Sequence, residues 1–307
     1  MVIPAQLRLT AVVKATSEAR CRLERMGRSS NPSSWRPVLM SKPARLVLAF
    51  AFLAALAAGI DRPAYAQASK AAPVHPKGAT CERPKFRVVL DVGHSAESPG
   101  AISARGVDEY DFNLRLAKLV DEKLRAAGFS NTVLQITSGQ IIPSLVRRTA
   151  DANKLNADLF LSIHHDSVPD KFKEKWTYEG KELQFSDRFK GHSIFISLNN
   201  RKANASLLFA RLLGKQMKAR GFEYTSQYTL PIMGNRRREL LDAEFGVYRF
   251  DELYVLKHTQ MPAALIEGGS IINRDEELLS ASEERQQLIA ASVVDAVEEF
   301  CAGKKPR

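Results

Sequence analysis

The sequence contains few cysteines, no apolar run long enough to cross a membrane comfortably, and no internal repeat. Three cysteines in 307 residues are too few for a disulfide-dense scaffold. The longest apolar run, residues 46–60, has 15 residues, whereas a spanning helix needs roughly 20. The absence of a repeat excludes a repeat architecture, and a hydrophobic content of 45% excludes a wholly disordered chain.

The 15-residue apolar run lies in a pattern typical of protein export. Met40 is followed by two basic residues, Lys42 and Arg45, then by the apolar run, and then by small residues ending at Ala66. This order predicts a secretory signal peptide over 40–66, cleaved near Ala66, and therefore a periplasmic or secreted protein. An uncleaved membrane anchor is the alternative. Since Met40 begins a complete signal by itself, we expect residues 1–39 to be an upstream extension.

The net charge of +11 would suggest nucleic-acid binding if it belonged to the folded part. Ten of the 45 basic residues and three of the 34 acidic ones lie in residues 1–66. The remaining 241 residues therefore carry only +4, and we expect no nucleic-acid partner. Of the cysteines, Cys81 and Cys301 remain after export. An oxidising compartment permits a disulfide between them, worth about 4–5 kcal/mol, and two free thiols are the alternative.

Apolar periodicity predicts alternating strands and helices after a linker over 67–84. Strands are expected at 86–92, 132–137, 157–163, 193–198 and 262–266, and helices at 109–127, 144–155, 203–220 and from Ser280 to Phe300. Gly128 and Gly221 are the expected helix stops, and Ser280 with Glu283 resembles a capping box. The alternation predicts one α/β domain over 85–301 with a twisted, mostly parallel sheet and helices on both faces, before a tail at 302–307.

Chemically active side chains follow several predicted strands. His94 follows the first strand, His164 and His165 follow 157–163, Glu267 follows 262–266, and Glu109 begins the first helix. These positions meet at the carboxyl edge of a parallel sheet, where sites form. Two imidazoles and a carboxylate suit Zn²⁺, and a further carboxylate can act as a base. The alternative to metal binding is that these side chains only make structural hydrogen bonds, and the sequence has no H-E-x-x-H motif to strengthen the metal interpretation. Because adjacent strand residues point to opposite faces, spacing does not show whether His164 or His165 joins the site.

Four short motifs resemble those of the zinc-dependent N-acetylmuramoyl-L-alanine amidases of the division-amidase type. They are DVGHS at 91–95, EYDFNL at 109–114, SIHHD at 162–166, and a proline at 262 followed by Glu267 and IIN at 271–273. Arg148 and Asn153 also fit the family pattern. The resemblance covers residues 85–301 and implies hydrolysis of the amide bond between the lactyl group of N-acetylmuramic acid and L-alanine in peptidoglycan.

The resemblance also implies roles for individual residues. It implies His94, Glu109 and His164 as ligands of Zn²⁺ and Glu267 as the general base, with Asp166 as a minor metal-proximal candidate. Val92 and Ser95 depart from the usual first motif without removing a ligand. The alternatives are a serine hydrolase using Ser95, a non-catalytic peptidoglycan-binding protein, and a zinc peptidase acting on stem peptides.

Two polar stretches, 168–190 and 224–250, interrupt the predicted α/β pattern. Relatives often carry an inserted helix that covers the zinc until a protein activator binds, and either stretch could supply it. Solvated loops are the alternative, and the run Arg236-Arg237-Arg238 is then a surface patch. We expect a monomer that acts on peptidoglycan. A protein activator is a further partner if one of these stretches covers the zinc, and constitutive activity is the alternative.

Overall fold

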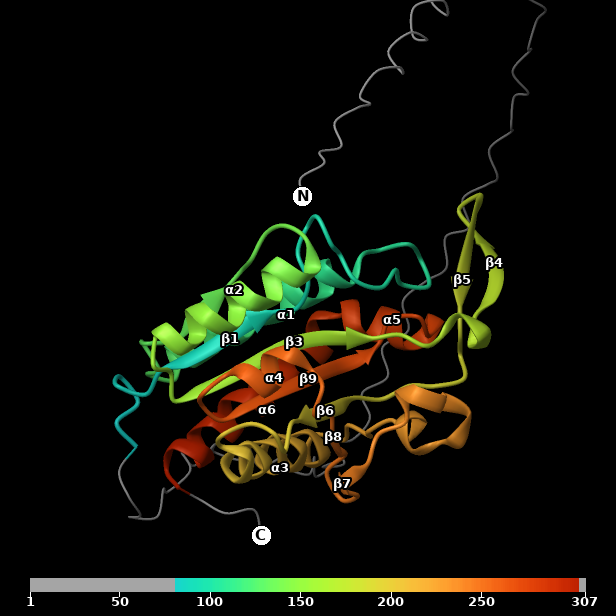
Figure 1. The fold of residues 1–307 in the computed structure, drawn as a ribbon. Helices are drawn as coiled ribbons and strands as arrows, with labels where there is room; N and C mark the ends of the chain where they lie inside the picture. Colours follow the sequence, from blue (N-terminus) through green and yellow to red (C-terminus); the bar gives the residue numbers. More distant parts are fainter. Residues whose placement is uncertain (1–80, 304–307) are drawn as a thin grey trace, which may run out of the picture. The chain divides into compact units, whose positions relative to one another are not determined.

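The computed structural model describes residues 81–303, which form a mixed sheet flanked by helices and a separate hairpin (Figure 1). The predicted upstream extension, the signal peptide, most of the linker and residues 304–307 lie outside the described residues. No helix in the described part is both long and apolar enough to cross a membrane.

The sheet has the strand order β2-β1-β3-β9-β6-β8-β7. Its strands are β1 (Val88–Val92), β2 (Val133–Gln135), β3 (Leu159–Asp166), β6 (Ser193–Ile196), β7 (Leu240–Asp242), β8 (Val247–Arg249) and β9 (Ala263–Ser270). The pairs β1–β2, β1–β3, β3–β9 and β6–β8 are parallel, whereas β6–β9 and β7–β8 are antiparallel. This confirms the prediction of a mostly parallel sheet.

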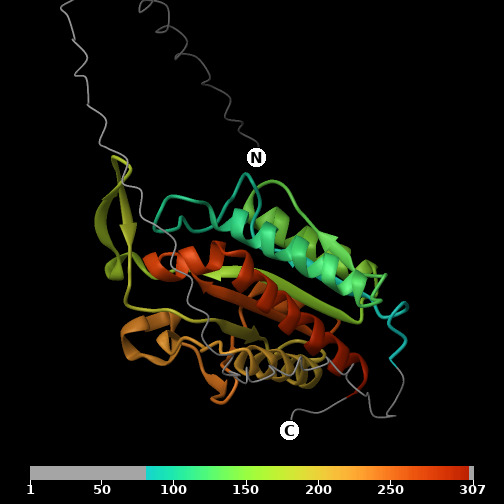
Figure 2. The same cartoon turned by 180° about the vertical axis from the view of Figure 1, so that it is seen from behind.

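Helices cover both faces of the sheet, as predicted (Figures 1 and 2). They are α1 (Glu109–Ala126), α2 (Ile141–Lys154), α3 (Ala203–Ala219), α4 (Tyr254–His258), α5 (Arg274–Ala281) and α6 (Glu283–Cys301). Helices α1, α3 and α6 bury apolar side chains against one face, and α2 and α4 contribute to a second cluster on the other. Because strand residues alternate between faces, Val88 and Leu90 join the first cluster and Val89 the second.

The predicted helix ends are partly correct. Gly128 and Gly221 follow α1 and α3 with φ angles of 94° and 81°, a left-handed conformation that glycine adopts readily. The predicted cap at Ser280 is wrong, because Ser280 lies inside α5. The cap of α6 is Ser282, whose side chain accepts a hydrogen bond from the Arg285 backbone N–H. A short unpredicted helix therefore separates β9 from α6.

The two polar stretches contain short regular elements and, within the described chain, no α-helix. The first holds the turn η1 (Asp170–Phe172) and a hairpin of β4 (Glu174–Tyr178) and β5 (Lys181–Phe185). The second holds η2 (Gln227–Thr229), η3 (Pro231–Arg236), β7 and β8. Strands β7 and β8 have three residues each, so their apolar alternation is too short to recognise in the sequence.

Cys81 and Cys301 are joined by a disulfide, with their Cα atoms 5.2 Å apart. The bond ties the segment before β1 to the last residue of α6, as the sequence permits. Beside it, Phe86 packs edge-on against Phe129 and Phe300, at ring-centroid distances of 6.0 and 6.3 Å. The covalent link thus lies at the end of the sheet where β1 begins.

Candidate active site

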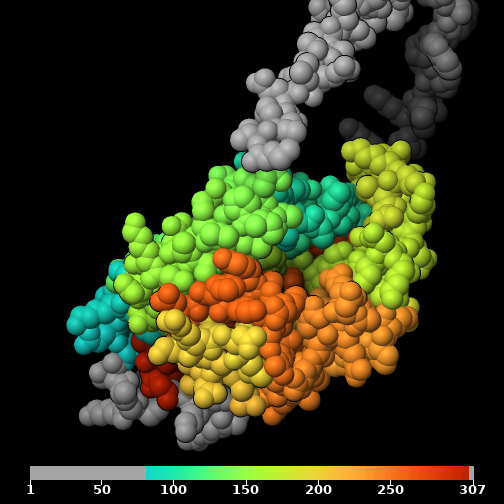
Figure 3. All heavy atoms as spheres, in the orientation of Figure 1, coloured from blue at the N-terminus to red at the C-terminus, as the bar shows by residue number. Residues whose placement is uncertain are grey.

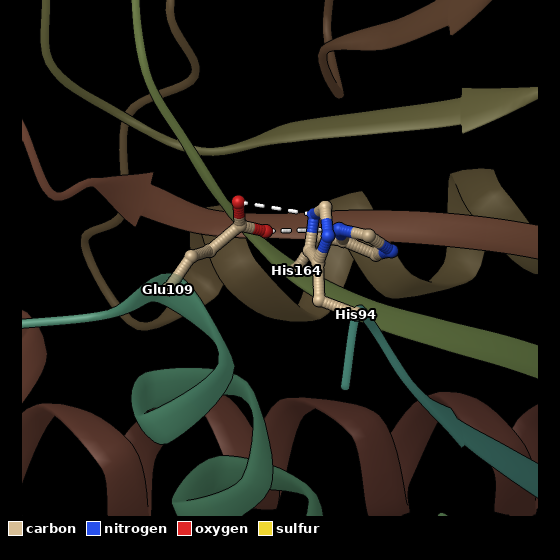
Figure 4. Close-up of side chains that lie close together, drawn as sticks. All are labelled: His94, Glu109 and His164. Atoms are coloured by element: carbon tan, nitrogen blue, oxygen red, sulfur yellow. Dashed lines mark hydrogen bonds and ion pairs between the residues drawn. The ribbon is translucent and has the colours of Figure 1, made fainter. Parts of the chain in front are cut away.

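The side chains of His94, Glu109 and His164 point toward one another from three separate elements (Figure 4). His94 follows β1, Glu109 is the first residue of α1, and His164 lies in β3. His94 Nε2 lies 3.1 Å from Glu109 Oε2, and His164 Nδ1 lies 3.0 Å from Glu109 Oε1. The parallel order β1-β3 and the return of the chain into α1 therefore bring the three predicted residues together.

Hydrogen bonds fix the Glu109 carboxylate from several sides. Oε2 accepts from the Ala101 backbone N–H at 3.0 Å, and Oε1 accepts from the Asn113 side chain at 3.1 Å. Although burial alone raises the pKa of Glu109, hydrogen bonds with His164 and His94 hold it well below its usual value. The carboxylate is therefore ionised and held in one orientation between the imidazoles.

Because Gly93 and Gly100 have no side chain, they provide the space in which His164 and Glu109 lie. A Cβ atom on Gly93 would lie 2.5 Å from the His164 ring, and one on Gly100 would lie 2.5 Å from Glu109 Oε2. His94 itself has a φ of 67°, a left-handed conformation that is uncommon for residues with a side chain. The backbone around the cluster is thus shaped for these side chains.

Arg148, which fits the family pattern, holds the backbone of His94 in its left-handed conformation. Its buried guanidinium donates Nη2–H to the carbonyl oxygen of His94 and Nε–H to Thr137 Oγ1 at 2.9 Å. Arg148 Nε also lies 3.6 Å from Asp91 Oδ1, and Ser162 Oγ donates to Asp91 Oδ2 at 2.7 Å. Asn153 instead joins α2 to the segment before β9, through His258 and Gln260.

The structure places His164, and not His165, in the cluster. Both lie within β3, which is longer than predicted, so their side chains point to opposite faces. His165 Nδ1 lies 2.9 Å from Asn113 Oδ1, and burial lowers the pKa of His165 to about 3. His165 is thus a neutral imidazole packed behind the cluster.

Glu267 lies in β9 directly beside His164 of β3. The sequence places Glu267 after its strand, but β9 continues to Ser270, so the residue is held by the sheet itself. Its Oε2 atom is buried, with no hydrogen-bond partner in residues 81–303. Burial and the nearby Asp166 and Glu109 carboxylates raise the pKa of Glu267 well above its usual value. An unpartnered acid therefore faces the cluster.

Asp166 is occupied by other contacts. Its Oδ2 accepts from Tyr228 OH at 2.7 Å and from Gln227 Nε2 at 2.6 Å. Burial raises the pKa of Asp166 to about 6. The sequence analysis did not identify Gln227 and Tyr228 as partners of Asp166. Asp166 is recognisable from its position beside a histidine, but no pattern within 224–250 indicates that Gln227 and Tyr228 contact it.

Two hollows meet at these residues. The first, here called the polar hollow, has a volume of about 630 Å³ and opens between the segments near residues 100, 170 and 236 (Figure 3). Its lining includes His94, Glu109, His164, Asp166, Arg236 and Glu267. The second, the apolar hollow, has a volume of about 340 Å³. Its lining includes His94, His164, Leu145, Phe195, Phe250, Leu265, Arg236, Arg238 and Glu267.

The donor set of the cluster fits a zinc ion. One ligand atom from each of His94, Glu109 and His164 lies within 4.8 Å of the other two, and two nitrogens with one carboxylate oxygen is a ligand combination used by catalytic zinc. Burial lowers the pKa of His164, which favours the neutral imidazole that binds metal. Glu267 stands outside the set, which leaves its carboxyl group free for proton transfer.

Ser95 does not have the surroundings of a nucleophile. It is buried, and its hydroxyl donates to the carbonyl oxygen of Gly139 at 2.9 Å. The adjacent His94 directs its Nε2 atom to Glu109. A serine nucleophile needs a base within hydrogen-bond reach, and among the described residues no histidine is hydrogen-bonded to Ser95 Oγ.

Comparison with known proteins agrees with this geometry. The sequence model of the family described as N-acetylmuramoyl-L-alanine amidase matches residues 88–299. N-acetylmuramoyl-L-alanine amidase AmiA of Escherichia coli (strain K12) is 26% identical over 224 residues, covering 68% of this chain and 74% of AmiA.

Solved structures show the same fold. The catalytic domain of CwlV, an N-acetylmuramoyl-L-alanine amidase from Bacillus (Paenibacillus) polymyxa var. colistinus, aligns with a TM-score of 0.51 and 25% identity over 70% of this chain and 97% of that one. Ami1 from Mycobacterium smegmatis aligns with a TM-score of 0.54 and 20% identity over 72% and 98%. The family match spans more than half of the sequence. The chain therefore belongs to the N-acetylmuramoyl-L-alanine amidases, enzymes that cleave the bond between N-acetylmuramic acid and L-alanine in peptidoglycan.

Proposed function

We propose that this amidase is zinc-dependent, with His94, Glu109 and His164 as the metal ligands and Glu267 as the residue that carries the proton. The observation that supports this most directly is the convergence of two imidazoles and one carboxylate within 4.8 Å beside a buried carboxyl group. A purely structural ion-pair cluster would not need an unpartnered acid next to it. The same arrangement argues against a non-catalytic binding protein, because all four residues are present and directed to one place.

A zinc ion bound there would supply a Lewis acid that polarises the lactyl carbonyl and lowers the pKa of water. Glu267 accepts the proton of the attacking water through its free Oε2 atom and returns it to the departing nitrogen of L-alanine. The raised pKa of Glu267, caused first by burial, makes its carboxylate a stronger base. Arg148 holds His94 in position through the backbone carbonyl during this exchange.

We further propose that the enzyme acts outside the cytoplasm. The Cys81–Cys301 disulfide supports this location, because such bonds form and persist in oxidising compartments. The predicted signal peptide over 40–66 supports it independently. The net charge of +4 left after removal of residues 1–66 is compatible with an anionic cell wall.

We expect activity without a protein activator. The polar hollow of about 630 Å³ reaches His94, Glu109 and His164 directly, and the described part of the chain places no α-helix from 168–190 or 224–250 across it. A gated enzyme needs an element that blocks substrate. If deletion of the β4–β5 hairpin raised the activity of the isolated protein, this expectation of ungated activity would be wrong.

The test is mass spectrometry of the products released from purified sacculi by the mature protein, with and without a chelator. Release of stem peptides with a free L-alanine amino group, abolished by the chelator and restored by zinc, is expected. Cleavage between amino acids of the stem would instead identify a peptidase. Chelator-resistant activity with labelling of Ser95 by a serine-reactive probe would identify a serine hydrolase.

A further inference from the structure

The run Arg236-Arg237-Arg238 is divided by the structure into two inward residues and one outward residue. Arg236 and Arg238 line the apolar hollow and are half-buried, whereas Arg237 is exposed and lines neither hollow. The backbone becomes extended after η3, with φ and ψ of −62° and 138° at Arg237, so successive side chains point to opposite sides. The alternation places two guanidinium groups beside the catalytic residues.

Neither inward arginine forms a close ion pair in the described part of the chain, and Arg236 acts on Asp166 and Glu267 only from a distance, where it opposes the rise in pKa that burial causes in both carboxyl groups. Within residues 81–303, no carboxylate oxygen lies within 4.0 Å of a guanidinium nitrogen of Arg236 or Arg238. Arg236 Nη2 makes one long contact with the Ser167 carbonyl oxygen, at 3.5 Å. A guanidinium group in a partly buried hollow that has no directly bonded anion is stabilised by a ligand that supplies a negative charge there.

Arg238 has hydrogen-bonding capacity left over. Its Nη1 donates to the carbonyl oxygens of Asn235 and Arg237, at 2.7 and 2.9 Å, which anchors the side chain. Its Nε is buried and has no acceptor in the described structure. The guanidinium lies 3.9 Å from the Phe250 ring centroid, so one of its faces is fixed by stacking. Within residues 81–303, Arg238 Nη2 donates no hydrogen bond, so Nη2 is the group of this anchored guanidinium that can bond a carboxylate oxygen in the hollow.

The two hollows differ in which part of the substrate they suit. The scissile amide must lie where they meet, at His164 and Glu267. A glycan continues on both sides of each N-acetylmuramic acid and needs the wider, polar hollow. The peptide begins with the small apolar L-alanine side chain, which suits the walls formed by Leu145, Phe195 and Leu265.

We propose that Arg236 and Arg238 form an anion site in the apolar hollow that binds the first free carboxylate of the stem peptide beyond L-alanine. This inference rests on the proposed function and adds a specificity to it. The two residues bind and position substrate, and the enzyme consequently prefers peptides whose second residue carries a carboxylate over those in which it is a carboxamide. The neutral substrate leaves both guanidinium groups without a partner in the hollow.

The test uses two synthetic N-acetylmuramoyl-L-alanyl peptides that differ only in a free α-carboxylate or a carboxamide on the second residue. For the zinc-loaded wild type we expect a KM about 10-fold lower for the carboxylate, equivalent to about 1.4 kcal/mol, with similar kcat. Arg238→Gln and Arg236→Gln are each expected to reduce this ratio severalfold toward one. Arg237→Gln is the matched control and is expected to keep it.

Because the ratio compares two substrates in one preparation, a partly unfolded variant does not distort it. Binding of the same peptides to zinc-loaded Glu267→Gln, measured by calorimetry, should show the same preference without turnover. Arg238→Lys should restore part of it. A wild type without preference, or an equal loss in Arg237→Gln, overturns the anion site while the amidase function stands. If the wild type cleaves neither peptide nor sacculi, the proposed function itself fails.

Discussion

At the carboxyl ends of β3 and β9, polar side chains are buried without full sets of partners, as Glu267 Oε2 and His192 Nε2 show within residues 81–303. At the opposite end of the sheet, the contacts are a disulfide, edge-on aromatic pairs and the ion pair of Arg83 with Glu298 at 2.8 Å. One end therefore carries groups that favour chemistry over stability, and the other carries contacts that favour stability. Activity and stability should respond separately to changes at the two ends.

The largest expected effect is on activity, at the carboxyl end. Glu267→Gln should lower kcat by about 10²–10⁴-fold, because the amide cannot accept a proton. The free energy of unfolding of the metal-free protein should change by less than about 1 kcal/mol, since glutamine has nearly the same shape as glutamate and Glu267 Oε2 makes no hydrogen bond within residues 81–303 that the change would break. Product release from sacculi and urea denaturation measure the two quantities. A large loss of stability in this variant would contradict the separation.

The opposite end should show the reverse. Replacing both Cys81 and Cys301 by serine should lower the free energy of unfolding by about 4–5 kcal/mol, because the disulfide restricts a long segment of the unfolded chain. The kcat should remain unchanged at a temperature where the variant is folded. Chemical denaturation of oxidised wild type, reduced wild type and the variant gives the comparison. Equal stability of oxidised and reduced wild type would refute the assignment.

A third change tests whether the metal cluster depends on space. Gly93→Ala should weaken zinc binding by about 10–100-fold, because the new Cβ would lie 2.5 Å from the His164 ring and displace it. Gly180→Ala, at the tip of the hairpin, is the control for a glycine substitution that strains the backbone without a clash, since the φ of Gly180 is 76° and nothing lies within 4 Å of its Cβ. Competition with a chromophoric chelator measures the affinity. Equal affinity of Gly93→Ala and wild type would show that the ring does not need this position.

The smallest expected effect is a dependence of stability on pH. Burial lowers the pKa of His192 to about 4, whereas the unfolded chain takes up this proton near pH 6.5. Stability is therefore complete above about pH 6.5 and falls as the pH drops toward 4, by about 2 kcal/mol between pH 7 and 5. His192→Asn should lose less over that range in denaturation experiments with a chelator present. An unchanged pH slope in the variant would assign the effect to other groups.

The regular parts of this fold could be predicted because their patterns are long. The apolar spacing of α1 and α3 gave their buried faces, and short motifs gave His94, Glu109, His164 and Glu267. The choice between His164 and His165 required the family resemblance. The alternation of side chains along a strand predicts that His164 and His165 point to opposite faces, but it does not show which face Glu109 lies on.

The remainder depends on contacts between distant segments. The inward position of Arg238 follows from the path of η3 and the stacking on Phe250, and neither is encoded in a local pattern. Tyr228 reaches Asp166 across 62 residues of sequence. The cap of α6 was misplaced by two residues because Ser280 and Ser282 both precede acidic residues, and only the fold of α5 distinguishes them.

The disulfide also has a mechanical consequence. Cys81 and Cys301 lie at the two ends of the domain's sequence and are covalently joined, with Cα atoms 5.2 Å apart. The points where the chain enters and leaves the domain are therefore adjacent, at the end of the sheet away from the hollows. A pulling force applied between those two flanks passes through the sulfur–sulfur bond and does not load the strands. A load applied between the two flanks therefore leaves the strand pairing at the catalytic edge unstressed.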